Sequence, residues 1–184
     1  MAATHRSWAA ELLHVWFHRL KPGDWFGSSE AVDEMLRRRF ARELAFLATR
    51  PAEEFLDDPH MALAAVLLFD QVPRNIHRGT PRAFATDPLA RAISKAALDR
   101  GWDMALTMRE RQFLAMPLMH SEDIADQHRC LAYFTQLGPQ YGLPFARSHY
   151  RMIARFGRYP HRNTVLGRKS TPAEKRAVAA GFSW

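Results

Sequence analysis

The sequence predicts an all-α fold, and three observations support this prediction. Apolar residues recur at helical spacing along most of the chain, and capping residues mark where several helices begin. No stretch of about five or more residues alternates apolar and polar side chains between turn residues, as a half-buried strand would. The connecting segments are short, which favours antiparallel neighbours. We therefore expect about eight to nine helices in antiparallel pairs, forming a single domain over residues 1–184.

The first helix boundaries follow from individual residues. Ser29 precedes a run whose apolar residues keep helical spacing as far as Leu47. Asp58 and Asp87 each stand before a proline, which is the arrangement of a capping side chain followed by the first helical residue. Gly101 is expected to end the helix that Asp87 begins, because glycine is favoured just after a helix C-terminus.

Two capping boxes mark further helix starts. Thr107 with Glu110, and Thr171 with Glu174, have the spacing at which each side chain bonds the backbone N–H of the other residue. With these signals, the expected helices span residues 6–20, 29–48, 59–70, 88–99, 108–115, 122–137, 143–156 and 172–181, with a shorter one near 81–85.

The composition is that of an ordinary globular protein. With 184 residues and 47% hydrophobic side chains, the chain is long enough to bury a sizeable core. The longest apolar run, residues 61–69, is about half of what a membrane-spanning helix needs, so we expect a cytoplasmic protein without a membrane partner. The lone cysteine, Cys130, excludes an internal disulfide and a cysteine metal cage, and we expect neither a metal nor a cofactor.

The charge is basic and is carried mainly by arginine. Lysine and arginine number 26 against 19 aspartates and glutamates, a formal net charge of +7. Arginine binds carboxylates and phosphates through a planar fork and tolerates burial better than lysine. The excess lies between Arg147 and Arg176, which favours an anionic partner: a small phosphorylated or carboxylated ligand, a nucleic acid, or an acidic patch on the same domain. A solvated basic surface is the alternative.

A first polar segment, residues 67–84, interrupts the apolar pattern. The apolar stripe of the helix from Pro59 continues to Asp70, which would lie at the helix C-terminus, where the helix dipole disfavours a carboxylate. We therefore expect Asp70 to be exposed or matched to a cation. Arg74 and Arg78 follow, and a turn at Pro73 would present them. A structural salt bridge and a ligand site both remain open.

A second polar segment covers residues 117–134. We expect Ser121 to cap the helix from residue 122, with Glu122 and Asp123 in its first turn, where carboxylates favour the dipole. Capping does not explain His120 or Gln127, which fall on the inward side. A buried Gln127 amide would need hydrogen-bond partners.

The third polar segment covers residues 149–174. His149 falls on an apolar helix face, and we expect it to be a hydrogen-bonded core residue. Gly157 ends this helix, and a turn dense in hydrogen-bond donors follows it over residues 158–163. We expect this turn to contact a ligand.

These segments carry three motifs that resemble those of the bacterial domain-of-unknown-function family 924. The motifs are DQxPRNxxRG, PxxHSEDxxxQ and FGRxPHRNxxLGRxST, which stand here at residues 70–79, 117–127 and 156–171. Val72 stands where the family commonly has phenylalanine, a packing change that leaves the polar residues in place. The resemblance implies a tetratricopeptide-like fold, in which stacked helix pairs leave a concave surface, and it implies no established activity.

The motifs consist mainly of charged, amide and imidazole side chains, which indicates a site rather than a scaffold signature. We expect a polar pocket on the concave face that binds a small anionic ligand, and whether it also transforms the ligand is left open. His120 or His161 would be the acid–base group, oriented by Glu122 or Asp123. The candidate catalytic residues are His120, Glu122 and His161, and the candidate ligand-binding residues are Asp70, Gln71, Arg74, Asn75, Arg78, Asp123, Gln127, Arg158, Arg162, Asn163 and Arg168.

Three alternatives compete with this hypothesis. The basic C-terminal segment could bind RNA, for example a tRNA-like structure, by tracking phosphates and stacking on unpaired bases. A stack of helix pairs could instead be an adaptor that recognises a peptide or a C-terminal carboxylate. A metal site matches no standard ligand spacing, and it would be built from His120, Glu122, Asp123, His128 and His161.

Overall fold

A computed structural model describes residues 7–182, and the regular structure in this range is helical throughout. The all-α prediction is confirmed, and the tetratricopeptide-like arrangement stays a prediction. The α-helices are α2 (Ser7–His14), α3 (Pro22–Phe26), α4 (Glu30–Leu47), α5 (Pro59–Val66), α6 (Val72–Ile76), α7 (Asp87–Asp99), α8 (Met108–Met119), α9 (Ile124–Leu137), α10 (Leu143–Phe156) and α11 (Pro172–Ala179). Two π-helical turns, Val15–Arg19 and Leu67–Gln71, continue α2 and α5, and short 3₁₀ turns lie at Pro81–Phe84 and Pro160–Arg162.

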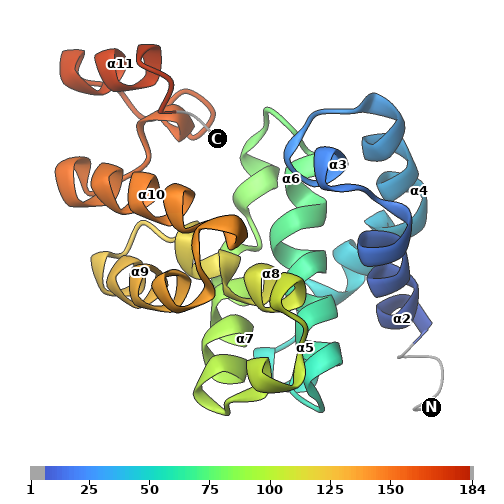
Figure 1. The fold of residues 1–184 in the computed structure, drawn as a ribbon. Coiled ribbons are helices and arrows are strands. Elements are labelled where there is room, and N and C mark those ends of the chain that lie inside the picture. The colour runs from blue at the N-terminus through green and yellow to red at the C-terminus, as the bar shows by residue number, and fades with distance from the viewer. Residues whose placement is uncertain (1–6, 183–184) are drawn as a thin grey trace.

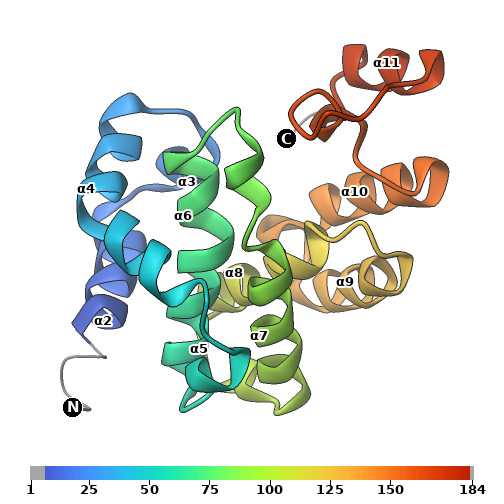
Figure 2. The ribbon, with the colours of Figure 1, turned by 180° about the vertical axis from the view of Figure 1, so that it is seen from behind.

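Helices α7, α8 and α9 each pack against the next helix along the chain, whereas the earlier helices pack mainly against helices further along the chain. Helix α9 packs between α8 and α10, α7 packs against α5 and α8, and α4 packs against α6 (Figures 1 and 2). Helix α11 stands beyond α10 at one end of the molecule, and the segment 157–171 connects the two (Figure 1). None of the helices in the described range combines the length and apolar character that crossing a bilayer requires.

The described residues form two hydrophobic clusters of unequal size. The larger extends from α2 to α10 and contains the fully buried Trp16, Phe69 and Phe113. The smaller consists of Met152, Ile153, Tyr159 and Ala177, with Phe156 and Phe182 packed against it. Burying one large apolar side chain contributes roughly 1.5–3 kcal/mol. The smaller cluster therefore anchors the segment after α10, which carries the third motif.

Most of the expected helix boundaries are confirmed. Ser29 accepts a hydrogen bond from a backbone N–H in the first turn of α4, and Asp58 does the same for α5. Thr107 and Thr171 form the expected capping boxes. Gly101 follows α7 in the left-handed conformation, with φ of 68°. The expected start of the first helix at residue 6 lies outside the described residues, and the short helix α3 was not predicted.

Two expected caps are wrong. Asp87 is the first residue of α7 and does not cap it, because its carboxylate turns away to bind arginines of other elements. Ser121 does not cap α9 either. The cap is Asp123, which accepts the backbone N–H of Ala125 at 2.8 Å, so α9 begins later than expected.

The expected turn at Pro73 is also wrong, because the chain remains helical from Pro59 to Ile76. Proline lacks an N–H and its ring collides with the preceding turn of an α-helix. Here the wider π-helical turn Leu67–Gln71 precedes Pro73, and the N–H of Val72 bonds the carbonyl of Leu67, five residues back. Asp70 consequently lies inside a continuous helical run, fully buried, and not at a helix C-terminus.

Candidate functional site

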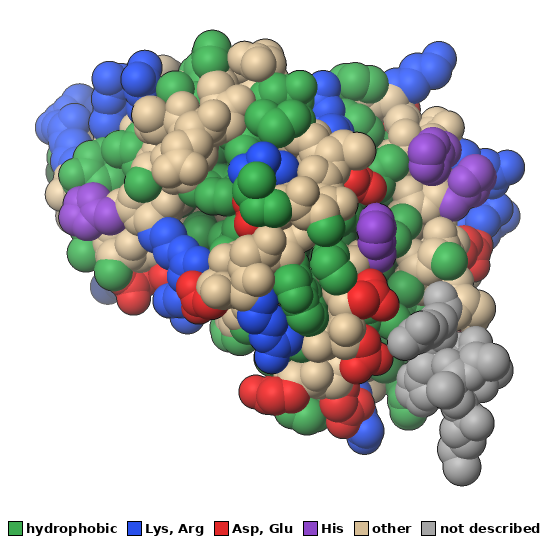
Figure 3. Space-filling model, turned by 60° about the horizontal axis from the view of Figure 1, so that its bottom comes forward, with side chains coloured by type: hydrophobic (Ala, Val, Ile, Leu, Met, Phe, Trp, Pro, Cys, Tyr) green, Lys and Arg blue, Asp and Glu red, His purple; other side chains and the backbone are tan. Residues whose placement is uncertain are grey.

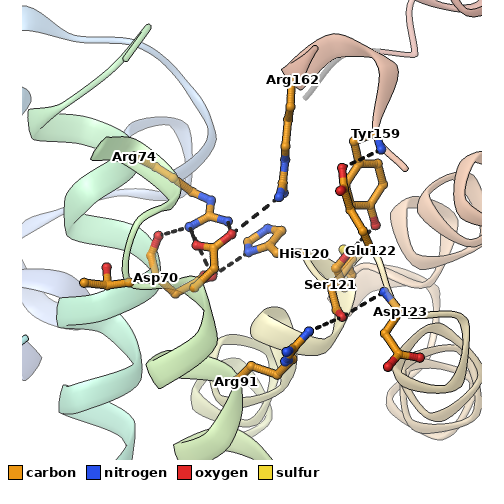
Figure 4. A network of polar contacts seen from close by, with 12 residues as sticks. Asp70, Arg74, Arg91, His120, Ser121, Glu122, Asp123, Tyr159 and Arg162 are labelled. Atoms are coloured by element: carbon orange, nitrogen blue, oxygen red, sulfur yellow. Dashed lines mark hydrogen bonds and ion pairs between the residues drawn. The ribbon is translucent and has the colours of Figure 1, made fainter. Parts of the chain in front are cut away.

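A cavity of about 490 Å³ lies where the three motifs meet. It is lined by Arg74 and Arg78 from the first motif, His120 from the second, and His161 and Arg162 from the third. The cavity shows that segments far apart along the chain converge on one recess. Figure 4 shows three of these side chains approaching one another from three directions: Arg74 from α6, His120 from the end of α8, and Arg162 from the segment after α10.

Beneath the polar end of the cavity, Asp70 and His120 form a buried pair. Oδ1 of Asp70 lies 2.7 Å from Nδ1 of His120, and Gln71 donates its amide N–H to Oδ2 at 2.6 Å. Burial alone would raise the pKa of Asp70, but the charge of Arg74, 3.2 Å from Oδ1, and the bond to His120 hold that pKa well below its usual range. Asp70 is therefore an ionised carboxylate that accepts the Nδ1–H of His120. This corrects the expectation that Glu122 or Asp123 orients His120.

Two guanidinium groups share the carboxylate of Asp87. Arg74 donates two hydrogen bonds to it, at 2.8 and 2.9 Å, whereas Arg162 reaches it only at 3.4 Å. The guanidinium of Arg162 lies between two rings, 4.6 Å from the centroid of Phe84 and 4.7 Å from that of Tyr159. Within the described range, Nε of Arg162 is buried without a hydrogen-bond partner. Burial and the neighbouring Arg74 lower the pKa of Arg162, so its positive charge is only partly compensated.

Three imidazoles surround this cation, and their environments keep them neutral at pH 7. Burial lowers the pKa of His149 to about 3, and burial together with Arg162 lowers that of His161 to about 4. Burial also lowers the pKa of His120, although Asp70 opposes the change. The rings of His120 and His149 lie 6.3 Å apart, and Nδ1–H of His149 donates to a backbone carbonyl at 2.8 Å.

The other end of the cavity is apolar. Trp25 and Phe26 of α3 line it together with Phe145 of α10 and Met116 and Met119 of α8. The indole N–H of Trp25 donates to a backbone carbonyl at 2.8 Å, which fixes the ring. Phe26 and Phe145 are 59% and 58% exposed. The cavity therefore joins a cationic end to an aromatic end.

A second cavity of about 310 Å³ adjoins the first. His120, Arg162 and Phe84 line both cavities. The second cavity is lined on its other sides by Asp87, Ser121 and Glu122, among others.

Several motif residues hold the third motif in place and do not face the first cavity. Glu122 binds Arg168 through two hydrogen bonds, at 2.7 and 2.9 Å, and accepts the backbone N–H of Tyr159 at 2.7 Å. Arg158 binds Glu174 at 2.7 and 3.0 Å. These ion pairs attach the segment 157–168 to the end of α8 and to α11.

Amides complete this scaffold. Gln127 is fully buried and donates to the hydroxyl of Tyr159 at 2.8 Å and to the carbonyl of Ser121 at 2.7 Å. Asn163 donates to Ser170 at 3.1 Å. None of these scaffold residues lines the first cavity, and neither does Asp123, which caps α9. The ligand-binding roles predicted for them therefore lack support: Asp123, Gln127, Arg158, Asn163 and Arg168.

The predicted residues that do line the first cavity are Gln71, Arg74, Asn75, Arg78, His120, His161 and Arg162. Sequence reasoning missed others. His149, expected only as a core residue, is buried and also lines the cavity. Asp87 was expected only as a helix cap. Its pairing with Arg74 was missed because the two residues stand thirteen positions apart, and no local sequence pattern indicates such a contact. The residues that the structure describes hold no cluster of three or more side chains suited to a metal ion.

Comparisons with known proteins agree with the motifs. The family model described as "Bacterial protein of unknown function (DUF924)" matches residues 12–181. A solved structure of a protein of unknown function from Agrobacterium tumefaciens, ATU0120, is 38% identical and superposes with a TM-score of 0.89, covering 98% of this chain and 99% of that chain. Among curated proteins, none is significantly similar to this chain.

Proposed function

The chain belongs to the bacterial family DUF924, and we propose that it binds a small molecule that joins one anionic group to an apolar body. The observation that carries this proposal is the environment of Arg162. A buried guanidinium whose carboxylate partner, Asp87, lies at 3.4 Å and is shared with Arg74 is costly unless an anion supplies a further partner to its terminal nitrogens. A carboxylate or phosphate would do so with two parallel hydrogen bonds.

The charge distribution of the cavity wall supports the same conclusion. Within the described part of the chain, the lining side chains include three arginines and three histidines but no aspartate or glutamate. Asp70 lies behind the wall, where it holds His120 and Arg74 and does not meet the cavity. The cavity thus presents cationic and neutral donors to its contents, as an anion site requires.

The aromatic end supports the apolar half of the ligand. Phe26 and Phe145 remain largely exposed, and a ligand ring or acyl chain packed on them would remove apolar surface from water. A volume of about 490 Å³ lies within the range of about 300–1,000 Å³ for small-molecule sites.

RNA binding is the weaker candidate. Two arginines of the basic C-terminal segment on which it was based bind carboxylates of this same chain: Arg158 pairs with Glu174, and Arg168 with Glu122. Basic side chains do gather at the end that α9 and α10 form, at the left in Figure 3, but acidic and basic side chains mix over the rest of that face. Salt-sensitive binding of single-stranded RNA, without binding of a small anion, would favour this candidate.

The proposal is tested by calorimetric titration with benzoate, a planar carboxylate on an aromatic ring, against the neutral benzamide. We expect benzoate to bind at least about tenfold more tightly than benzamide. At a hundredfold excess over its Kd, benzoate should stabilise the protein by about 2.7 kcal/mol, which raises the Tm by about 5–10 °C.

The matched variants are Arg162→Gln and Arg155→Gln. Arg155 is exposed, stacks on Phe156 and lies outside the cavity, so its variant should bind benzoate like the wild type. Arg162→Gln should lose binding. Equal benzoate affinity in both variants would contradict the proposal.

A further inference from the structure

The hydrogen bond to Asp70 fixes which nitrogen of His120 is available for chemistry. Nδ1–H donates to the buried carboxylate, so Nε2 of the neutral ring carries the lone pair. Within residues 7–182, no hydrogen bond engages Nε2, and the ring lines both cavities. A carboxylate behind a histidine stabilises the imidazolium that forms when the ring accepts a proton. The pair therefore has the arrangement of a general base.

Apart from its imidazoles, the described wall of the first cavity offers no covalent nucleophile. Among the described residues that line it, none carries a hydroxyl, thiol or amine. The hydroxyl of Ser121 faces the second cavity but donates to Asp126, at 2.8 Å, and accepts from Arg91 at 2.9 Å. We therefore take water, activated by an imidazole, as the nucleophile of a reaction at this site.

Arg162 supplies the complementary charge. It lines the same two cavities as His120, and its positive charge is close enough to be among the causes that lower the pKa of His120 (Figure 4). Its Nη1 reaches Asp87 only at 3.4 Å, and its Nη2 donates to none of the described residues. A preorganised buried donor of this kind stabilises negative charge that develops on a reacting oxygen.

We propose that this site hydrolyses carboxylic esters of small hydrophobic acids, with His120 as general base, Asp70 as its positioning residue and Arg162 as the partner of the oxyanion. This inference rests on the proposed function, since the acid that the reaction releases is the anion proposed to bind there. The aromatic end of the cavity would hold the acyl part of the ester.

Nε2 of His120 takes a proton from water while the water oxygen bonds to the carbonyl carbon, and the carbonyl electron pair moves to its oxygen beside Arg162. The tetrahedral intermediate then re-forms the carbonyl and breaks the bond to the leaving oxygen, which receives the proton from Nε2. Ester and water give acid and alcohol, and the acid loses a proton to solvent to become a carboxylate beside Arg162.

The experiment measures release of p-nitrophenolate from p-nitrophenyl benzoate by the full chain between pH 5 and pH 9. The main variant is His120→Gln, whose amide can still donate to Asp70 but cannot accept a proton at neutral pH. We expect kcat/KM to fall by about 10²- to 10⁴-fold. His128→Ala is the control, because His128 lies on α9 against Tyr150, outside the cavity, and this variant should match the wild type.

Two further measurements separate catalysis from structure. The wild-type rate should decline below about pH 6.5 as the base becomes protonated, and Asp70→Asn should shift that decline as well as lower the rate. Benzoate should inhibit competitively, with an inhibition constant equal to its calorimetric Kd.

Each outcome bears on one proposal or both. If His120→Gln hydrolyses the ester as fast as the wild type, the proposed esterase mechanism is contradicted. If benzoate nevertheless binds to both proteins, the proposed binding function stands without the catalytic one. If benzoate binds to neither, the binding function fails. His120→Ala serves as a second variant, and its circular dichroism and Tm show whether a lost rate reflects lost folding.

Discussion

Asp70 and His120 stand fifty positions apart in the sequence, yet their side chains form a 2.7 Å hydrogen bond inside the protein. Two irregularities of the helices make this contact. The π-helical turn Leu67–Gln71 lets the helical run continue past Pro73, so Asp70 stays buried, and α8 ends immediately before His120. The contact joins the first two motifs, and Arg162 brings the third motif to the same cavity.

The first prediction concerns the stability contributed by Arg162. Arg162→Met keeps the apolar packing between Phe84 and Tyr159 but removes a partly compensated buried charge. We expect the Tm to stay the same or rise, because residues of a binding site are commonly kept at the expense of stability.

Arg168→Met is the matched comparison. It breaks two hydrogen bonds to Glu122 and one to the carbonyl of Tyr159, and we expect a loss of about 1–3 kcal/mol. Both Tm values are measured by calorimetry. A loss of several degrees in Arg162→Met would assign Arg162 to the scaffold instead.

The second prediction concerns Gln127, which we assign to the scaffold. Gln127→Ala removes the donor to Tyr159 and leaves buried carbonyls without their partner. We expect the free energy of unfolding in urea to fall by about 1–3 kcal/mol, with benzoate affinity unchanged. Gln136→Ala, at an exposed position of the same helix, should change neither quantity. A large loss of affinity in folded Gln127→Ala would mean that Gln127 takes part in binding.

The third prediction concerns the apolar end of the cavity. Phe145 is 58% exposed, so its truncation to alanine should change stability little. We expect Phe145→Ala to weaken benzoate binding about tenfold, corresponding to about 1.4 kcal/mol. Phe46→Ala is the control, because Phe46 is 64% exposed on α4 and does not line the cavity. Equal benzoate affinities in the two variants would show that Phe145 does not contact the ligand.

The fourth prediction concerns pH. The pKa of His149 is lowered to about 3, so below pH 6.5 the unfolded chain binds a proton at this residue that the folded chain does not. The contribution of neutral His149 to the free energy of unfolding is fully present above pH 6.5. It is lost as the pH falls from 6.5 toward the pKa of His149 in the folded protein. Between pH 6.5 and pH 4, this one residue should make stability fall by about 1 kcal/mol per pH unit.

The slope of unfolding free energy against pH checks this prediction in His149→Gln, which has no such titration. The variant should show a shallower fall than the wild type over pH 4.5–6.5 and the same dependence above pH 7. Identical slopes would show that His149 is protonated in the folded protein.

Local signals in the sequence were sufficient for most of the fold. Caps such as Ser29, Asp58 and Thr107 act through bonds to residues two or three positions away, so the sequence alone places them correctly. The turn expected at Pro73 failed because one extra residue in the preceding helical turn removes the collision that the proline would cause.

The site could be predicted only in part. The motifs identify the segments that converge, and His120, Arg74 and Arg162 do line one cavity. The sequence does not separate these residues from Gln127 or Arg168, because lining a cavity and bracing its wall both require buried polar side chains. Which carboxylate pairs with which cation depends on contacts between distant segments, and no local pattern records those contacts.

The most direct test of the central claim is a crystal structure of the protein with benzoate. We expect the carboxylate of benzoate to be hydrogen-bonded to the guanidinium of Arg162, with the ring packed against Trp25 and Phe145. Benzoate bound at any other place, with this cavity filled only by water, would contradict the claim that the three motifs form an anion site.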